Sequence, residues 1–400
     1  MKKEQSMLFR EVVDKSFIEE LQDLQLCFHK NPELSCREYE TSKFLKEYVL
    51  NLGFNIKPVS ETGFIANYKF ETPGKTLAIR TDIDALPIIE DANNLKGLKK
   101  CISKNQGIMH ACGHDAHMSI LLICLKLIIK YKEFFSGELI AIFEDGEECG
   151  AGIDNIVSTL KDYSIDAIYG NHVYNGLDTG KVIINKDYVM AACGMFDVQV
   201  VGQGGHGSRP DYANSPIVCT NSIISTIYQM LMSRIDVEKT VTFALTKLQA
   251  GNTLNVIPNI CEFGGTLRYF DYEQGELAIN IIQTICNSIG AAYNCDIIFK
   301  ELIADRYSVK NDCSLAEIAQ NALIKNYPES LVTNQRWYAS ETFSRYSKIA
   351  PCVFTLVGIR NSELGTGAEH HNSRFEVDPE GLKYGLATMF QFSLDFLNNN

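Results

Sequence analysis

Apolar and polar positions along the chain predict alternating helices and strands. Between residues 14 and 26, Phe17, Leu21 and Leu24 recur at helical spacing and would share one buried face. Further helices are predicted at residues 39–52, 119–129, 216–232, 276–289, 314–324 and 379–397. Strands are predicted at residues 55–59, 64–70, 76–80, 139–143, 167–171, 196–201, 241–249, 261–269 and 353–357. This mixture indicates an α/β protein.

The order of the elements changes near residue 190, which indicates two domains. From there the chain reads strand, helix, strand, strand, helix, strand, an order that suits a compact α+β insert. A chain of 400 residues also exceeds the usual size of a single hydrophobic core. We therefore expect one domain built from residues 1–189 and 304–400, interrupted by a second domain at residues 190–303.

The composition of the chain indicates which kinds of partner and which cellular compartment to expect. The chain has 37 Lys and Arg against 49 Asp and Glu, a net charge of -12, which argues against nucleic acid or an anionic membrane as the main partner. The first residues contain no apolar stretch that resembles a signal peptide, and the apolar run at residues 118–129 is too short to span a bilayer. The thirteen scattered cysteines suit reduced thiols. These features predict a cytoplasmic protein that binds neither nucleic acid nor a membrane.

Residues 109–118, M-H-A-C-G-H-D-A-H-M, hold the densest group of chemically active side chains. Cys112 and His114 are separated only by Gly113, which lets the backbone turn sharply enough to aim both side chains at one point. A thiolate and an imidazole are good ligands for zinc or a similar metal, and the apolar run that follows would anchor them on a core helix. Alternatively, the three histidines follow helical spacing and form the polar face of an ordinary helix, with an inert buried cysteine beside them.

Further candidate ligands follow predicted strands. In E-D-G-E-E, the adjacent Glu147 and Glu148 can serve two different atoms, one holding a metal and the other its water. A solvated acidic turn is the alternative interpretation of this pair. His172 follows the strand predicted at residues 167–171, and two more histidines at residues 370–371 precede the last helix. Seven of the eight histidines lie in loops or at strand ends beside glycines and acids, which favours a metal-dependent hydrolase.

Nine motifs resemble, in order, those of one enzyme family. They are H-K-N-P-E-L-S at 29, R-T-D-I-D-A-L-P at 80, M-H-A-C-G-H-D-A-H at 109, F-E-D-G-E-E at 143, N-H-V at 171, G-Q-G-G-H-G-S-R-P at 202, N-V-I-P at 255, G-T-L-R at 265 and H-N-S-R-F at 371. With them the chain resembles the amidohydrolase branch of the zinc-dependent aminoacylase and carboxypeptidase superfamily. Hippurate hydrolases, auxin–amino acid conjugate hydrolases and N-acyl-amino-acid deacetylases belong to this branch.

The resemblance implies a fold and a metal centre. The catalytic α/β domain would contain a mixed β-sheet flanked by helices, and the insert would be a smaller α+β lid and dimerisation domain. One or two divalent metal ions, zinc above all and otherwise manganese, cobalt or nickel, would bind in the catalytic domain. The implied ligands are Cys112, His114, Glu148, His172 and His371. His114 would replace a ligand histidine that the broader superfamily carries at the position of Arg80.

The resemblance also implies roles for five other residues. Glu147 would be the general base that takes a proton from the metal-bound water and delivers it to the leaving amine. Asp82 would orient a ligand histidine. His206, from the lid of the partner subunit in a homodimer, would stabilise the oxyanion. Asn255 and Arg268 would meet the carboxylate of the substrate.

The chain departs from the usual motifs of this branch at several positions. The usual E-D-F-S reads E-T-F-S here, so an acid is missing at Thr342. The usual Q-P-A-E-E reads E-D-G-E-E, which adds Glu144 and Asp145. Ser373 replaces a proline, and Cys193 stands where a small serine is common. None of these changes removes an implied ligand.

These motifs predict a metal-dependent amidohydrolase that cleaves the amide bond of a small N-acyl amino acid with a metal-activated water. A metallo-dipeptidase or aminopeptidase is the alternative substrate class. A thiol hydrolase with Cys112 as nucleophile would leave the glutamate pair unexplained, and a chelator would not inhibit it. A catalytically silent binding protein of the same fold is a further alternative, against which the retention of Glu147 beside all five ligands speaks.

Overall fold

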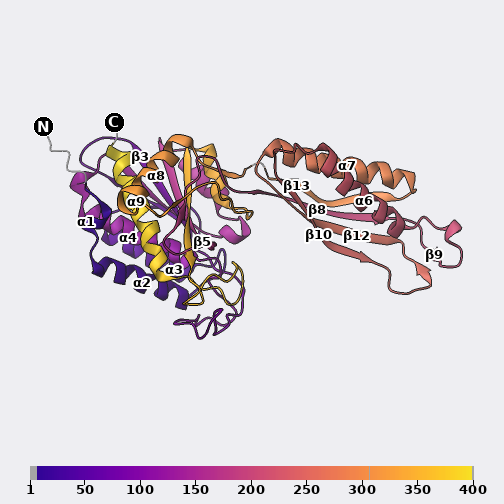
Figure 1. Cartoon of the computed structure of the whole chain (residues 1–400), viewed down its shortest axis with the longest axis horizontal. Helices are drawn as coiled ribbons and strands as arrows, with labels where there is room; N and C mark the ends of the chain where they lie inside the picture. Colours follow the sequence, from indigo (N-terminus) through magenta and orange to yellow (C-terminus); the bar gives the residue numbers. More distant parts are fainter. Residues whose placement is uncertain (1–6, 306, 399–400) are drawn as a thin grey trace. The chain divides into compact units, whose positions relative to one another are not determined.

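The computed structural model describes residues 7–305 and 307–398, and the chain divides into two compact units (Figure 1). Unit 1 comprises Met1–Val189, Lys310–Gln335 and Thr342–Asn400, and unit 2 comprises Met190–Val309 and Arg336–Glu341. Unit 2 is thus inserted into the chain of unit 1. It also includes the short segment at residues 336–341, which the expected boundaries place in the catalytic domain.

An eight-stranded mixed sheet forms the centre of unit 1, in the order β1-β2-β4-β3-β5-β16-β6-β15. Its strands are β1 Asn55–Pro58, β2 Phe64–Lys69, β3 Thr76–Asp82, β4 Glu138–Glu144, β5 Ala167–Asp178, β6 Val182–Ile183, β15 Leu331–Val332 and β16 Cys352–Arg360. β3 runs parallel to β4 and β5, and β16 runs parallel to β5, whereas β2 is antiparallel to β1 and β4. The expected mixed α/β architecture is confirmed. The carboxyl ends of the parallel strands meet at one edge, where sheets of this kind place their sites.

Helices and short turns cover this sheet. The helices are α1 Phe9–Val12, α2 Lys15–Lys30, α3 Tyr39–Asn51, α4 His114–Lys130, α5 Ile153–Leu160, α8 Cys313–Asn326 and α9 Pro379–Asn398. The 3-10 turns are η1 Lys132–Phe134, η2 Glu147–Cys149 and η4 Thr342–Lys348. α2 begins where Asp14 accepts hydrogen bonds from the backbone N–H groups of Ser16 and Phe17. One hydrophobic core joins α4 and α9 to the strands, with Leu121 and Phe390 fully buried in it.

Two elements of unit 1 extend beyond their predicted bounds. α4 begins at His114, five residues before the predicted start, because its polar first turn is buried and hydrogen-bonded and therefore gives no apolar signal. β5 continues past Asn171 to Asp178, since β16 pairs with it along this length. His172 accordingly lies within a strand and opposite Leu356 of β16, and the predicted position at a strand end is wrong.

Unit 2 is an antiparallel sheet with two helices. The sheet has the order β10-β12-β8-β13, with β8 Ala192–Val201, β10 Val241–Ala250, β12 Ile260–Tyr269 and β13 Asp296–Ala304. The helices are α6 Pro216–Arg234 and α7 Tyr272–Ala292, and their residues Ile223 and Ile282 are buried in the same core as Val198 and Phe263. β9 Gly205–His206 pairs with β11 Val256–Ile257, and the turn η3 is Pro210–Tyr212. β7 Tyr188–Met190 pairs with β14 Val309–Lys310.

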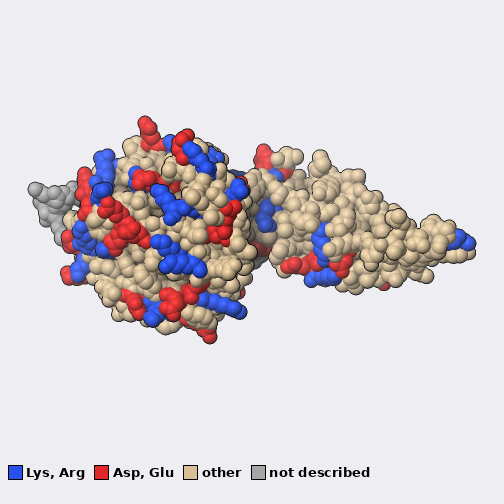
Figure 2. All heavy atoms as spheres, turned by 90° about the horizontal axis from the view of Figure 1, so that it is seen from below, with Lys and Arg blue, Asp and Glu red and all other residues tan. Residues whose placement is uncertain are grey.

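The number of charged side chains differs between the visible surfaces of the two units. Acidic and basic residues are interspersed over the face of unit 1 that Figure 2 shows. The face of unit 2 in the same view carries few charges. Across the described part of the chain, every helix is too short or too polar to cross a bilayer.

Candidate metal centre and active site

The turn before α4 is shaped by Gly113. This residue caps the helix in a left-handed conformation with a φ of 94°. A Cβ atom here would come within 2.3 Å of a methyl carbon of Val173, so any other residue would be strained and crowded. The sharp turn allows Cys112 and His114 to lie together at the start of α4, beside β5.

Hydrogen bonds on Nδ1 leave Nε2 of His114 and His172 directed toward the candidate site. His114 Nδ1 lies 3.0 Å from both the carbonyl oxygen and Oδ1 of Asp84, and its Nε2 has no hydrogen-bond partner. His172 Nδ1 donates to the carbonyl oxygen of Val173 at 2.6 Å. His172 Nε2 then lies 3.5 Å from the sulfur of Cys112. A second partner on Nδ1 is the arrangement that orients imidazoles to bind a metal through Nε2.

The five predicted metal ligands lie in two groups of three that share Cys112. Ligand atoms of Cys112, His114 and His172 all lie within 4.8 Å of one another. The same holds for Cys112, Glu148 and His371, and Glu148 Oε1 is 3.3 Å from His371 Nε2. Glu148 Oε1 and His114 Nε2 are 3.8 Å apart, and both atoms are buried without a hydrogen-bond partner. This set of sulfur, nitrogen and carboxylate donors fits a divalent metal such as zinc.

Two aspartates at the end of β3 support this centre. Besides contacting His114, Asp84 accepts a hydrogen bond from the backbone N–H of Glu148 at 3.0 Å. Asp82 instead accepts a hydrogen bond from His117 Nδ1 at 2.7 Å, and its Oδ2 lies 3.7 Å from His114 Nε2. The carboxylate that holds the Nδ1 of a candidate ligand is therefore Asp84, whereas Asp82 holds His117.

Glu147 lies on the turn η2, next to the candidate ligand Glu148. Oxygen atoms of both glutamates lie within 4.8 Å of a ring nitrogen of His114. The backbone N–H of Thr342 donates to Glu147 Oε1 at 3.1 Å. One turn thus presents a carboxylate that could bind a metal and a second carboxylate that is oriented by the backbone.

Burial and neighbouring charges set the protonation of the centre. Burial raises the pKa of the Cys112 thiol well above its usual value, and Glu148 adds to this effect. Burial lowers the pKa of His172 well below its usual value, which keeps the ring neutral and able to bind a metal. For His114, burial is outweighed above all by Asp82, which raises the pKa of the imidazole well above its usual value. A bound cation would favour loss of the protons on Cys112 and His114.

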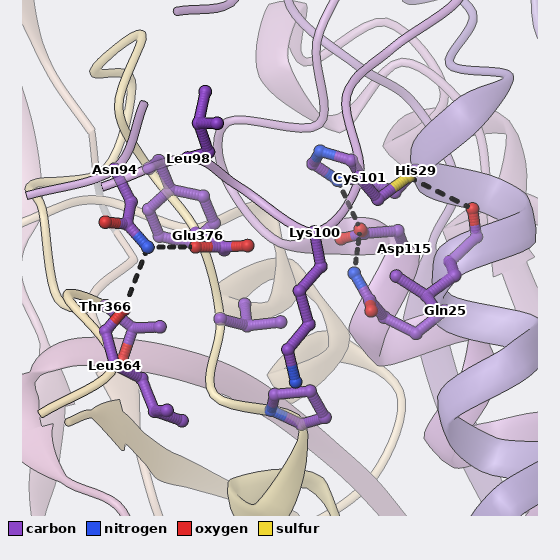
Figure 3. Close-up of a pocket in the computed structure, with 14 residues that line it drawn as sticks. Gln25, His29, Asn94, Leu98, Lys100, Cys101, Asp115, Leu364, Thr366 and Glu376 are labelled. Carbon is purple, nitrogen blue, oxygen red and sulfur yellow. Dashed lines mark hydrogen bonds and ion pairs between the residues drawn. The ribbon is translucent and has the colours of Figure 1, made fainter. Parts of the chain in front are cut away.

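A buried ion-pair cluster holds the first turn of α4 against α2 (Figure 3). His29 Nδ1 lies 2.8 Å from Asp115 Oδ2, and His29 Nε2 lies 3.0 Å from Glu90 Oε1. Gln25 donates to the same oxygen of Asp115 at 2.7 Å. Burial opposes the charge on His29, but Asp115 and Glu90 raise its pKa to about 10. Because Asp115 follows His114 directly, this cluster fixes the position of a candidate ligand.

Two of the site residues predicted in unit 2 lie together. His206 in β9 is paired with Val256 of β11, and the carbonyl oxygen of Asn255 accepts the N–H of Gly207 at 2.8 Å. The side chain of His206 is exposed, as is Asn255. His206 Nδ1 accepts the backbone N–H of Ser208 at 3.1 Å, so Nε2 carries the proton of the neutral ring.

Arg268 lies elsewhere in unit 2, near the end of β12, where it is paired with Cys193 of β8. The start of β12 adjoins the loop that leads to His206, because Asn259 accepts the N–H of Gly202 at 2.8 Å. The extended chain between residues 260 and 268 spans about 26 Å. A small substrate therefore cannot contact both Arg268 and His206 of the same chain.

Several supporting residues have no role in the sequence-based prediction. Asp84 belongs to the motif T-D-I-D-A-L-P, so its closeness to Asp82 was a usable signal. Thr342 contacts Glu147 through its backbone N–H, which no pattern of side chains indicates. His117 uses both ring nitrogens, since its Nε2 accepts the N–H of Val173 at 2.9 Å in addition to the contact with Asp82.

Known proteins resemble the chain over nearly its full length. Residues 78–395 match the family described as peptidase family M20/M25/M40. The chain is 32% identical over 399 residues to thermostable carboxypeptidase 2 of Saccharolobus solfataricus, which covers 96% of this chain and 98% of that protein. It is 30% identical over 373 residues to the N-acetylcysteine deacetylase of Bacillus subtilis, with 93% of this chain and 95% of that protein covered.

A solved structure shows the same relationship. A dinuclear metal-binding peptidase of family M20 from Bacillus subtilis matches with a TM-score of 0.81 and 27% identity, over 97% of this chain and 100% of that one. The family inferred from the motifs is confirmed. With its donor cluster at the edge of a mixed sheet and a family match over most of its length, the chain belongs to peptidase family M20/M25/M40 and is a metal-dependent hydrolase of amide bonds.

Proposed function

We propose that the protein hydrolyses the amide bond of a small N-acyl amino acid. The observation that carries this proposal is the convergence of five metal-ligand side chains with Glu147 in unit 1. The relative named N-acetylcysteine deacetylase, matched over almost its whole length, supports an acylated amino acid as the substrate class.

The proposed metal ligands are Cys112, His114, Glu148, His172 and His371. Since they form two groups that share Cys112, we propose that one or two divalent ions bind here. Zinc suits the thiolate and imidazole donors best, with manganese, cobalt or nickel as alternatives. When bound, the metal would polarise the scissile carbonyl and lower the pKa of water to about 7.

Glu147 would move the proton in this reaction. An amide has a poor leaving group, so its hydrolysis requires removal of a proton from the attacking water and protonation of the leaving nitrogen. Glu147 lies within 4.8 Å of His114 and Glu148, and the N–H of Thr342 fixes the orientation of its carboxylate. The same carboxylate would accept the proton from water and then deliver it to nitrogen.

His206, Asn255 and Arg268 would complete the site. The Nε2–H of His206 would donate to the developing oxyanion, while Asn255 and the fork of Arg268 would bind the substrate carboxylate. Because β12 separates Arg268 from the other two residues within one chain, we propose that His206 and Asn255 come from the partner in a homodimer. The exposed edge strand β10 and the exposed apolar side chains Tyr228 and Met232 of α6 support such an interface.

A metallo-dipeptidase or carboxypeptidase is the second candidate, and the similarity to a thermostable carboxypeptidase favours it. A panel of substrates separates the two: N-acetyl and N-benzoyl amino acids, and unblocked dipeptides, assayed with the same zinc-loaded enzyme. We expect kcat/KM to be at least tenfold higher for the N-acyl amino acids. Hydrolysis of unblocked dipeptides alone would overturn the proposal. A metal-loaded protein that hydrolyses none of them would point to the catalytically silent alternative.

A further inference from the structure

Glu144 and Thr342 are in direct contact beside the turn that carries Glu147. Glu144 ends β4, Thr342 begins η4, and the Thr342 hydroxyl donates to Glu144 Oε1 at 2.7 Å. The pair thus holds one carboxylate, that of Glu144.

Arg80 is the common partner of both residues. Its Nε donates to Glu144 Oε2 at 2.7 Å, and its Nη2 donates to Thr342 Oγ1 at 3.0 Å. The guanidinium is only 1% exposed and also donates to Asp82 at 2.8 Å. Tyr346 completes the cluster with a hydrogen bond to Glu144 Oε2 at 2.8 Å. Without Glu144, the buried guanidinium would keep only Asp82 of these two carboxylate partners, and the loss of a partner of a buried charge is destabilising.

The pair is connected to Glu147 by two routes. Thr342 donates its backbone N–H to Glu147 Oε1 at 3.1 Å, while its hydroxyl is held by Arg80 and Glu144. Glu144 is also the last residue of the strand that leads into the turn carrying Glu147. Movement of Thr342 or Glu144 would therefore change the direction of the Glu147 carboxylate.

We propose that Glu144 and Thr342 are positioning residues for Glu147, which act together through their common contact with Arg80. Neither residue needs to touch the substrate for this role. They act by holding the N–H of Thr342 against Glu147, so their effect is on kcat. The proposal rests on the proposed function in one respect, the use of Glu147 as the proton carrier.

Three variants test the pair: Glu144→Gln, Thr342→Asp and the double variant, which moves the acid from one position to the other. Glu144→Gln leaves Arg80 short of one carboxylate, and Thr342→Asp places a second acid beside Glu144. We expect each single change to lower kcat by about tenfold or more, with KM and bound metal little changed. The double variant restores one acid at the pair, and its kcat should return to within about threefold of the wild type, a non-additivity typical of contacting residues.

Conservative variants at Thr342 separate positioning from folding. Thr342→Val removes the hydroxyl and keeps the backbone N–H, and it should lower kcat, whereas Thr342→Ser should recover most of the loss. Thr388→Val is the matched control, because Thr388 is a buried threonine whose hydroxyl donates to the carbonyl oxygen of Tyr384 within α9. It should lower the unfolding midpoint without changing kcat.

All variants are assayed on whichever substrate of the panel the wild type hydrolyses, so an error in the substrate class does not affect the result. The unfolding midpoints of the same four proteins provide a second double-mutant cycle that needs no activity. Additive losses in both cycles would overturn the proposal that Glu144 and Thr342 act together through Arg80. Coupled midpoints with a normal kcat in Glu144→Gln and Thr342→Val would show that the pair supports the fold and does not position Glu147.

Discussion

At the scale of single residues, the centre depends on partners that occupy one atom of a side chain and leave another for chemistry. Asp84 lies within hydrogen-bond distance of His114 Nδ1, and Nε2 of the same ring lies 3.8 Å from Glu148 Oε1. The backbone N–H of Thr342 does the same for Glu147, since it holds one oxygen of the carboxylate. Each of these contacts restricts the side chain to few orientations before the reaction, so that less conformational entropy is lost in reaching the reactive geometry.

The variant Glu147→Gln should retain metal and lose turnover. Glutamine has nearly the same shape as glutamate and can still accept the N–H of Thr342, but it cannot take a proton from water. We expect kcat to fall by a factor of about 10² to 10⁴, the usual contribution of a general base. Bound metal is measured in the same sample, and Glu71→Gln, at an exposed site in unit 1, is the control. Near-normal kcat in metal-loaded Glu147→Gln would refute the assignment.

The sequence indicated the side chains that we propose for the chemistry, but only part of the contacts that orient them. Cys112, Glu147 and Glu148 were identified because residue type and spacing encode metal and proton chemistry. The role of Thr342 depends on its backbone N–H, which every residue except proline possesses. This contact was therefore accessible only from the folded chain, whereas the motif that contains Asp82 and Asp84 had indicated an acid that orients a ligand histidine.

At the scale of elements, α4 carries candidate site residues in its first turn and core residues along the rest of its length. The apolar run of α4 predicted its buried part, but its start at His114 could not be predicted, because the buried polar turn is stabilised by contacts distant in sequence. Among these contacts is the pairing of Asp115 with His29 of α2, at a separation of 86 residues. Packing of α2 against α4 therefore contributes both to stability and to the position of a ligand.

The variant His29→Ala should destabilise the protein in a pH-dependent manner. The pKa of His29 is raised from 6.5 to about 10 in the folded state, so the stability gained from its charge is complete below about pH 6.5 and is lost as the pH rises through about 10. Near pH 6 we expect a loss of about 3–5 kcal/mol in the free energy of unfolding, because Asp115 loses its cationic partner and Glu90 keeps only Lys99.

Denaturant unfolding of wild type and variant between pH 6 and pH 10 measures this difference. It should shrink toward the alkaline end of the range. Lys30→Ala, at the exposed neighbouring position, should show a small and pH-independent change. A difference for His29→Ala that stays constant across the range would contradict a charged His29.

At the scale of the whole molecule, the order of elements predicted a two-domain chain, but the number of subunits at the active site depends on distances that the sequence does not contain. The resemblance implied that His206 acts from the partner subunit and that Asn255 and Arg268 both bind the substrate carboxylate. The register of β12 separates Arg268 from the other two by most of the length of a strand. This separation is the physical reason for assigning His206 to the partner subunit.

Mixed dimers test that assignment. His206→Ala should lower kcat by about two to three powers of ten, the loss expected for one oxyanion donor, without loss of metal. Mixing His206→Ala subunits with Glu147→Gln subunits should recover activity, because a heterodimer would contain one intact composite site. Subunit exchange is followed with two differently tagged chains. A mixture that exchanges subunits and remains inactive would show that His206 does not act across the interface.

The central claim is that hydrolysis depends on a metal held by the Cys112 cluster, and one titration tests it most directly. Wild type and Cys112→Ser are stripped with a chelator, dialysed and titrated with zinc, while bound metal and hydrolysis of an N-acyl amino acid are measured in the same samples. For the wild type, activity should rise with bound metal and level off at one or two ions per chain, whereas Cys112→Ser should need more zinc. Full activity of the stripped wild type at less than about a tenth of an ion per chain would contradict the metal mechanism.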